Sequence, residues 1–215
     1  MAISSPNRQS SNHEPSTPCS ASRLIGGEHS ITSPVVGAAA ARHQGLTVLQ
    51  IDAHADLRDE YLGEPHSHAC AMRRSLDHAR LVQVGIRNIS SGEVSALPGL
   101  DTTIFYDFNM RQDPQWMDRV VDTLSDNVYV TIDVDGFDPA IMPATGTPEP
   151  GGLSWYEGLA LLRKTFERRN VVGLIQRTKH GAGDHAPARH DAHDLTMENV
   201  FLSFDARRFR AIDAS

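Results

Sequence analysis

The sequence has little cysteine, no long apolar run and no excess of positive charge, and each absence narrows the choice of function. Cys19 and Cys70 are the two cysteines among 215 residues, which indicates neither a disulfide framework nor a cysteine-rich zinc site. No run is apolar enough to cross a membrane or to act as a signal peptide. The net charge of −7 provides no basic stripe for nucleic acid. We therefore expect a cytoplasmic protein with neither nucleic acid nor membrane as partner.

The overall composition is that of one folded domain, and a segment of different composition precedes this domain. A hydrophobic content of 40% and a charged content of 22% are ordinary for a globular protein of this length. Residues 1–23 are rich in serine, proline and asparagine, and we expect them to form a disordered leader. Arg8 and Arg23 are its sparse positive charges, which argues against a transit peptide.

The character of the chain changes again after Gly173. Residues 174–215 show little periodicity and contain four histidines close together: His180, His185, His190 and His193. We interpret these histidines as compositional and not as a metal-binding tract. The expected organisation is a leader (1–23), an α/β core (24–173) and a divergent tail (174–215).

Short apolar runs in the core alternate with helical patterns. Runs rich in β-branched residues predict buried strands at 46–52, 81–86, 102–107 and 128–135. Helices are expected at 34–43, 113–125 and 154–169. Asp113 is the expected N-cap of the second helix with Pro114 after it, and Ser154 and Glu157 have capping-box spacing. This alternation predicts an α/β domain with a mainly parallel sheet and helices on both faces.

Three segments carry aspartate and histidine where an α/β sheet would bring them together. They are GGEHS with His29, DAHAD with Asp52, His54 and Asp56, and DVD with Asp133 and Asp135. Ligands of open α/β sheets bind beyond the carboxyl ends of the strands, so the segments are expected to meet at one edge. One Asp-x-Asp alone more often forms a turn or a helix cap, but three matching segments favour a metal site. Four carboxylates and two imidazoles suit two divalent ions, and this mixture favours manganese over zinc or copper.

Five blocks of the sequence resemble a known family. GGEHSIT, IDAHADLRDEY, SHACAMRR, VQVGIRNIS and TIDVDGFDPAIMPATGTPEPGGLSW are similar to the signature blocks of the ureohydrolases and, within them, of the agmatinases. The resemblance spans about residues 24–173. It implies an arginase-like three-layer α/β/α sandwich, incomplete at both ends of the chain. It also implies two Mn²⁺ ions, hydrolysis of guanidino compounds to an amine and urea, and a homo-oligomer.

The resemblance implies a role for each candidate ligand. One manganese ion would be bound by His29, Asp52, Asp56 and Asp133. The other would be bound by Asp52, His54, Asp133 and Asp135. Asp52 and Asp133 would then bridge the ions, and a metal-bridging hydroxide would attack the guanidinium carbon.

Two further side chains complete the implied catalytic machinery. Asp56 would also hold the hydroxide in line through a hydrogen bond. His68 would donate a proton to the leaving amine, with His66 as the less favoured substitute. The alternative interpretation of both histidines is that they are exposed loop residues.

The choice of substrate depends on Arg58. Arginases carry an asparagine at the matching position, where it helps to bind the carboxylate of the amino acid, and this chain has Arg58 instead. A substrate without that carboxylate, such as agmatine, is therefore favoured. Its hydrolysis gives putrescine and urea and belongs to polyamine biosynthesis. Guanidinobutyrate is the alternative substrate, because the positive charge of Arg58 also suits the carboxylate of an acid.

Two departures from the family bear on activity. Family members have a folded segment before the GGEHS block, and they carry a guanidinium-binding glutamate in an FDVVEL-like block. This chain reads VVGLIQRTKHGAGD at that block, and its next glutamate is Glu198. The alternative function is therefore a catalytically impaired metal-binding relative or a truncated fragment of an agmatinase. A zinc deacetylase of similar sheet topology is a third option, which the two sets of ligands disfavour.

Overall fold

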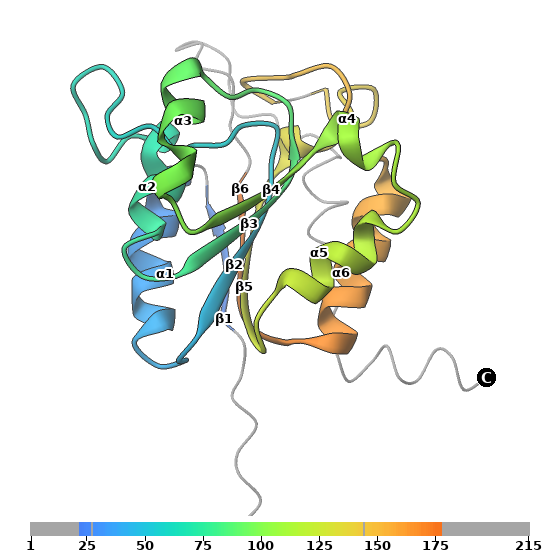
Figure 1. Cartoon of the computed structure of the whole chain (residues 1–215), viewed down its shortest axis with the longest axis horizontal. Coiled ribbons are helices and arrows are strands. Elements are labelled where there is room, and N and C mark those ends of the chain that lie inside the picture. Colours follow the sequence, from blue (N-terminus) through green and yellow to red (C-terminus); the bar gives the residue numbers. More distant parts are fainter. Residues whose placement is uncertain (1–21, 27, 144, 178–215) are drawn as a thin grey trace, which may run out of the picture.

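A six-stranded parallel sheet forms the centre of the protein in the computed structural model, which describes residues 22–26, 28–143 and 145–177 (Figure 1). The strands are β1 (Ser22–Gly26), β2 (Leu46–Ile51), β3 (Arg80–Ile86), β4 (Thr102–Tyr106), β5 (Asn127–Asp133) and β6 (Asn170–Arg177). Their order across the sheet is β1-β6-β5-β2-β3-β4, and every neighbouring pair is parallel.

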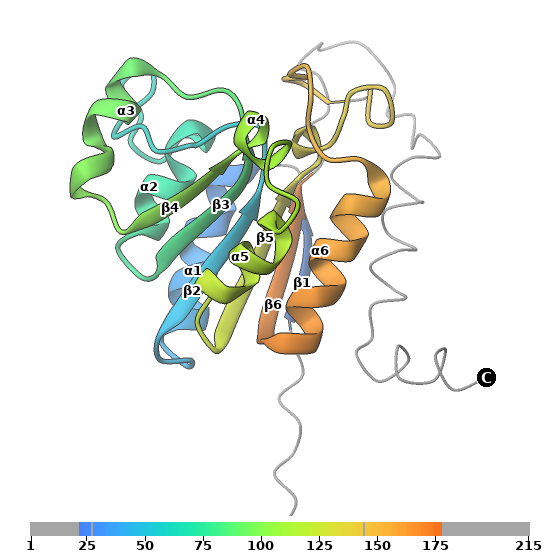
Figure 2. The ribbon, with the colours of Figure 1, turned by 45° about the vertical axis from the view of Figure 1, so that its right-hand side comes forward.

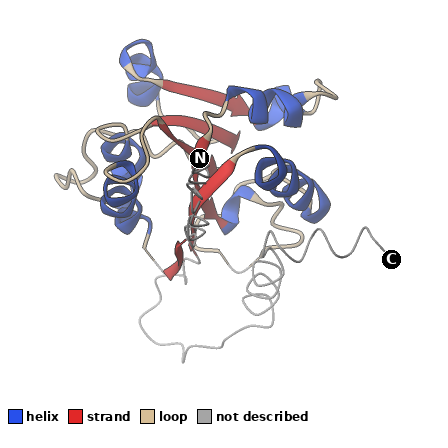
Figure 3. Ribbon diagram, turned by 90° about the horizontal axis from the view of Figure 1, so that it is seen from below, coloured by secondary structure: helices blue, strands red, loops and turns tan. Residues whose placement is uncertain are grey.

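Helices cover both faces of this sheet, as the view from below makes clear (Figure 3). One face carries α1 (Thr32–Ala40), α2 (Ala71–Ser75) and α3 (Ser91–Ala96). The other carries α4 (Asp107–Met110), α5 (Trp116–Thr123) and α6 (Trp155–Arg168), and Figure 2 shows α5 and α6 side by side. Short 3-10 turns lie at His29–Ile31, His68–Cys70, Leu97–Gly99 and Val134–Gly136. The expected three-layer α/β/α sandwich is confirmed.

The core lies on both faces of the central strands. Every residue of β2 is buried, and β3 and β5 are buried after their first residues. Trp116 and Leu161 pack from α5 and α6 on one face, while Val36 and Met72 pack from α1 and α2 on the other. Burial on two faces explains why these strands read as continuous apolar runs. It also holds their carboxyl ends in fixed positions.

The four predicted strands correspond to β2, β3, β4 and β5, whereas β1 and β6 were not predicted as strands. β1 begins at Ser22, so the expected leader boundary at residue 23 falls inside a strand. β6 continues to Arg177, so the boundary at Gly173 also falls inside a strand. Residues 22–26 of β1 pair with residues 173–177 of β6, so neither boundary separates a folded part of the chain from an unfolded one at that residue.

One predicted helix cap is wrong and another is confirmed. Helix α5 begins at Trp116 after Gln115, and Asp113 Oδ1 accepts a hydrogen bond from Gln115 N at 3.0 Å, which makes a local turn. At α6, Ser154 Oγ accepts from Glu157 N and the Glu157 carboxylate accepts from Ser154 N, as the capping box requires.

Several sequence features lie outside the described residues. These are Cys19, Glu198 and the histidines of the tail, His180, His185, His190 and His193. Cys70 is a free and buried thiol. No helix in the described part of the chain combines the length and the apolar character that crossing a membrane requires.

Candidate metal centre

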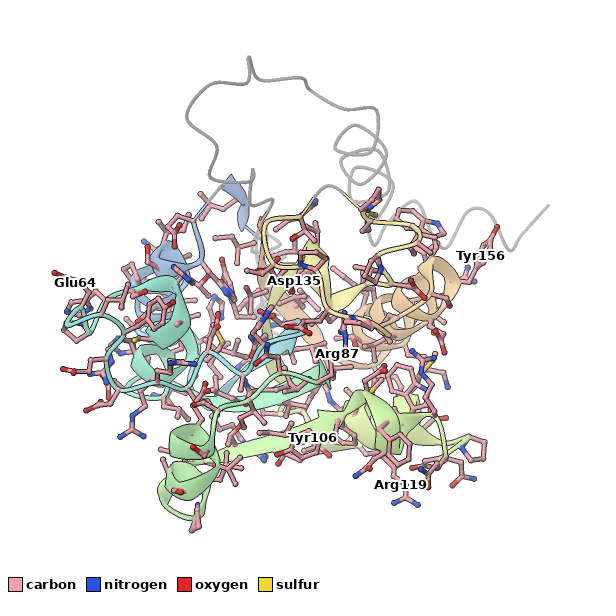
Figure 4. All side chains as sticks on the ribbon, turned by 90° about the horizontal axis from the view of Figure 1, so that it is seen from above. Glu64, Arg87, Tyr106, Arg119, Asp135 and Tyr156 are labelled. Carbon is pink, nitrogen blue, oxygen red and sulfur yellow. The ribbon has the colours of Figure 1, made fainter. Side chains whose placement is uncertain are left out.

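All six candidate ligands lie at the carboxyl edge of the sheet. His29 opens the 3-10 turn that follows β1, and Asp52 directly follows β2. Asp133 is the last residue of β5, and Asp135 lies in the 3-10 turn after it. Figure 4 looks down on this edge and shows Asp135 near its middle, beside Arg87. The predicted convergence of the three segments is therefore found in the structure.

The DAHAD segment lies beyond the strand, although the predicted strand range of 46–52 included Asp52. β2 ends at Ile51, so Asp52, His54 and Asp56 lie beyond the strand and do not share one of its faces. Asp56 has a φ of 51°, a left-handed conformation that aspartate tolerates better than most residues. This backbone turn places its carboxylate Oδ2 2.8 Å from His29 Nδ1. Local turns, and not the strand pleat, aim these side chains.

The ligand atoms form two groups that share one carboxylate. In each group the atoms lie within 4.8 Å of one another. The first group is His29, Asp52 and Asp133. The second group is Asp52, His54 and Asp135. Asp56 joins the first group through its hydrogen bond to His29.

The carboxylates are placed close to both histidines and are removed from water. Asp52, Asp133 and Asp135 are at most 1% exposed. His29 Nδ1 lies 3.6 Å from Asp52 Oδ2, and His54 Nδ1 lies 3.2 Å from Asp135 Oδ2. A buried carboxylate is costly unless positive charge compensates it. Three buried acids beside two imidazoles therefore leave negative charge to be neutralised.

The pKa values of the cluster reflect this crowding. Burial raises the pKa of Asp52, and the neighbouring charges of Asp135 and Asp133 raise it further, well above the ordinary value. Burial opposes the charge on His54, but its hydrogen bonds to Asp135 and Asp52 dominate and raise its pKa to about 11. Burial would raise the pKa of Asp135, yet the hydrogen bond and charge of His54 lower it to about 2. Without metal, the protonated His54 supplies positive charge that a metal ion would otherwise provide.

The donor set fits divalent ions. Carboxylate oxygens with imidazole nitrogens suit first-row divalent metals, and a carboxylate common to two groups suits a pair of ions. Burial lowers the pKa of His29, but the hydrogen bond and charge of Asp56 raise it above its ordinary value. Both groups of ligands therefore have the composition and spacing of a two-metal site.

Residues that sequence reasoning missed support this edge. Thr147 Oγ1 donates a 2.9 Å hydrogen bond to Asp135 Oδ2. Arg87 Nη2 donates to the backbone oxygens of Asp135, at 2.6 Å, and of Glu149, at 3.0 Å. Arg87 thus ties the loop before α6 to the ligand turn after β5. Arg87 lies in the block VQVGIRNIS and Thr147 lies in the block TIDVDGFDPAIMPATGTPEPGGLSW. The spacing of residues within these blocks does not reveal the contacts.

A cavity of about 160 Å³ opens beside the cluster. Its walls include His54, Asp56, Arg58, Tyr61, His68, Asn88 and Thr147. His68 meets the ring of Tyr61 edge-on, with the ring centroids 5.7 Å apart, and its Nδ1 lies 3.5 Å from Glu28 Oε1. His66 lines a different hollow, together with Ser30 and His78. The structure therefore separates the two candidate histidines and places His68 at the site.

The rim of the cavity carries charges of both signs. The Arg58 guanidinium lies over the Tyr61 ring, 5.1 Å from its centroid, and its Nε is 3.9 Å from Glu93 Oε2. Near the candidate ligands, Glu149 Oε1 lies 3.7 Å from His54 Nε2 and accepts a short hydrogen bond from Asn88 Nδ2. The cavity wall therefore carries the Arg58 cation and the Glu93 carboxylate, and Glu149 lies next to the wall residues His54 and Asn88.

The fold and the site together define a parallel α/β/α protein with a candidate two-metal centre at the carboxyl edge of its sheet. Residues 14–174 match the arginase family, and the chain belongs to this family. This membership favours the ureohydrolase interpretation over the zinc deacetylase alternative.

Two relatives of known name and one solved structure show how similar this chain is to other proteins. An N(1)-aminopropylagmatine ureohydrolase of Synechocystis sp. is 43% identical over 152 residues, covering 69% of this chain and 50% of the relative. An agmatinase of Pyrococcus horikoshii is 39% identical over 156 residues, covering 70% of this chain and 52% of the relative. The crystal structure of the agmatine ureohydrolase of Thermoplasma volcanium superposes with a TM-score of 0.69 at 29% identity, covering 88% of this chain and 64% of the other. This chain spans about half the length of the curated relatives it matches.

Proposed function

We propose that this protein is a manganese-dependent amidinohydrolase of the agmatinase type, which hydrolyses a guanidino compound to an amine and urea. The observation that carries the proposal is the pair of ligand groups that share Asp52 beside a cavity lined by His68. Membership of the arginase family supports the reaction class. We expect the cytoplasm as the location.

The metal ligands in this proposal are the six residues predicted from the sequence: His29, Asp52, His54, Asp56, Asp133 and Asp135. When bound, two divalent ions would lower the pKa of water and so supply a nucleophile near neutral pH. Asp56, whose Oδ2 contacts His29 Nδ1, would accept a hydrogen bond from that nucleophile and orient it. Asp135 is held for its role by Thr147.

His68 is the proposed proton donor to the leaving amine. Glu28 Oε1 lies 3.5 Å from its Nδ1, so this nitrogen of the ring faces the Glu28 carboxylate. In this proposal Nε2, the other ring nitrogen, is the atom that transfers the proton. A protonated nitrogen leaves as a neutral amine, whereas an unprotonated one would have to leave as an unstable nitrogen anion. Proton donation would therefore contribute to the rate.

Glu149 is the proposed carboxylate for the guanidinium. It lies at the cluster, is not among the proposed ligands, and is held by Asn88 and by the contact of Arg87 with its backbone. Charge-assisted hydrogen bonds to a carboxylate both hold and orient a guanidinium. Glu149 would therefore supply the interaction that the family obtains from its FDVVEL-like block.

Agmatine is the proposed substrate, and two related compounds test the proposal. N(1)-aminopropylagmatine, named in the relative from Synechocystis sp., is a longer cation with the same guanidinium. Guanidinobutyrate carries a carboxylate in place of the amine, and Arg58 at the rim would pair with it. The ratio of kcat/KM for these three compounds identifies which charge the rim selects.

The test is urea release from each compound, with and without Mn²⁺, and the metal content of the same purified sample. Turnover that depends on Mn²⁺ supports the proposed function. Two bound ions without turnover would identify the alternative, a metal-binding relative that is catalytically impaired. Absence of both metal and turnover would contradict the proposal. Sedimentation of the same sample tests the expected homo-oligomer.

A further inference from the structure

Two buried glutamines connect Asp52 to the interior of the sheet. Gln50 on β2 and Gln83 on β3 are neighbours in register, and both are fully buried. Gln50 Nε2 donates to Asp52 Oδ2 at 2.8 Å and to the backbone oxygen of His54 at 3.1 Å. One amide group therefore holds both the carboxylate that the two ligand groups share and the backbone of the histidine ligand.

The second glutamine holds the first one in place. Gln83 Nε2 donates to Gln50 Oε1 at 2.5 Å and to the backbone oxygen of Ala55 at 2.7 Å. Thr102 on β4 donates from its hydroxyl to Gln83 Oε1 at 3.1 Å. The chain of hydrogen bonds thus runs from the edge strand through β3 and β2 to Asp52.

The donors and acceptors of this chain fix the orientation of both amides. Each Nε2 has two hydrogens and each hydrogen has an oxygen to meet. Rotating the Gln50 amide by half a turn would place Oε1 against the Asp52 carboxylate and the His54 carbonyl, which are both acceptors. A fully satisfied buried network has one stable arrangement, whereas each unpaired group in a half-satisfied network destabilises the fold.

The same hydrogen bonds leave room for two ions on Asp52. Its other oxygen, Oδ1, accepts from His54 N at 2.7 Å, so each carboxylate oxygen receives one protein N–H apart from the imidazoles of His54 and His29, whose Nδ1 atoms lie 3.5 and 3.6 Å away. A carboxylate oxygen has two lone-pair directions, and one on each oxygen is left for a cation. Gln50 is neutral, so it orients the carboxylate without cancelling the charge that a divalent ion requires.

We propose that Gln50, supported by Gln83, positions Asp52 as the carboxylate shared by two divalent ions. The inference relies on the proposed function in treating the cluster as a metal centre, but it does not require hydrolysis. Gln50 and Gln83 are positioning residues, since they act through Asp52 and do not touch the cavity. Groups that orient metal ligands typically change metal affinity by about 10- to 100-fold.

The test compares Mn²⁺ affinity in Gln50→Met, Gln83→Met and the double variant, measured by competition with a fluorescent chelator. Methionine keeps the length and the packing of the side chain and removes the donor. Thr47→Val is the matched control, because Thr47 is buried on the same strand and bonds Ser125, away from the ligands. Thermal unfolding in chelator shows that each variant is folded.

We expect Gln50→Met to bind Mn²⁺ about 10- to 100-fold more weakly, with Thr47→Val within about threefold of the parent. Gln83 bonds both Gln50 and the Ala55 backbone, so the double variant should lose less affinity than the sum of the two single losses. Unchanged affinity in Gln50→Met, an equal loss in Thr47→Val, or additive losses in the double variant would each overturn the proposal. If Gln50→Met does not fold, Gln83→Met, which leaves the contact of Gln50 with Asp52 intact, provides the test. Weakened Mn²⁺ affinity in Gln83→Met would then support the proposal, and unchanged affinity would overturn it.

This test separates the positioning role from the proposed function. Weakened Mn²⁺ binding in the variants, together with no urea release from the parent protein, would support the positioning role and contradict hydrolysis. A parent protein that binds no Mn²⁺ would overturn both.

Discussion

Gly136 packs directly against the backbone of Asp52, although the two residues follow different strands. A Cβ atom at position 136 would lie 2.8 Å from Asp52 N and 3.0 Å from Asp52 Cα, too close for any side chain. The segment after β5 can therefore approach the segment after β2 because residue 136 has no side chain. This contact sets the distance between the two ligand-bearing turns.

Replacing Gly136 by alanine should separate those turns and weaken metal binding. We expect Gly136→Ala to lower Mn²⁺ affinity at least tenfold, because the new methyl group must displace Asp52 or Asp135. Gly99→Ala is the control, since a Cβ there meets no atom within 4 Å. Chelator competition measures both variants, and equal affinities would show that the contact does not control the site.

Removing individual ligands should change the number of bound ions in a way that depends on which group they serve. Asp52→Asn removes the shared carboxylate and should abolish both ions, whereas His54→Asn should retain about one ion per chain. Elemental analysis after gel filtration in Mn²⁺ gives the stoichiometry. Equal loss in the two variants would argue against two distinct groups.

The Asp52→Asn variant should also lower stability without metal. Asparagine would set its amide N–H against either Gln50 Nε2 or His54 N, so we expect the free energy of unfolding to fall by about 1–3 kcal/mol. The parent protein should instead gain stability from Mn²⁺, about 2.7 kcal/mol per site at a metal concentration of 100 Kd. Thermal unfolding of both proteins, with and without Mn²⁺, measures these opposite responses.

His68 and His66 should differ in their effect on turnover. His68→Asn should lower kcat by about 10²- to 10⁴-fold with unchanged metal content, because it removes a general acid. His66→Asn should leave kcat unchanged, since His66 lines another hollow. Steady-state urea release decides the point, and comparable losses in the two variants would contradict the assignment of His68.

Glu149→Gln should selectively weaken the recognition of guanidino substrates. Losing a charged hydrogen-bond partner costs about 1.5–3 kcal/mol, so kcat/KM for agmatine should fall by about 10- to 100-fold. Metal content should remain as in the parent, because Glu149 belongs to neither ligand group. An unchanged kcat/KM would exclude a role in guanidinium binding.

Metal affinity should rise with pH. In the metal-free protein the pKa of His54 is raised to about 11, so this imidazole carries a proton at neutral pH. A metal ion binds the neutral imidazole and must displace that proton. The pKa of His29 is also raised, which acts in the same direction. Between pH 6 and pH 8 we expect an increase of about tenfold per pH unit for each histidine deprotonated.

Calorimetry in buffers of different ionisation enthalpy provides the corresponding proton count. Binding of Mn²⁺ should release protons near neutral pH, and fewer of them in His54→Asn. An affinity that is flat between pH 6 and pH 8 would mean that both imidazoles are already neutral before the metal binds.

The sequence predicted the parts of the fold that local pattern encodes. The continuous apolar runs of β2, β3 and β5 identified the central strands, because burial on both faces requires them. The Ser154–Glu157 pair identified the start of α6, because a capping box lies within one turn of chain. β1 and β6 were not predicted as strands, since β1 is a short edge strand that is completed by pairing with β6. Asp113 forms a turn two residues before the true cap, which spacing does not distinguish from a cap.

By itself, the sequence determined which residues form the candidate centre. His29, Asp52, His54, Asp56, Asp133 and Asp135 follow from residue type and from the rule that parallel strands end at one edge. The tertiary structure alone decided how these side chains are aimed and supported. The left-handed turn at Asp56, the separation of His68 from His66, and the Gln50–Gln83 pair all depend on contacts between residues far apart in the chain. Such contacts exist only after the sheet has assembled, and no pattern within a single segment specifies them.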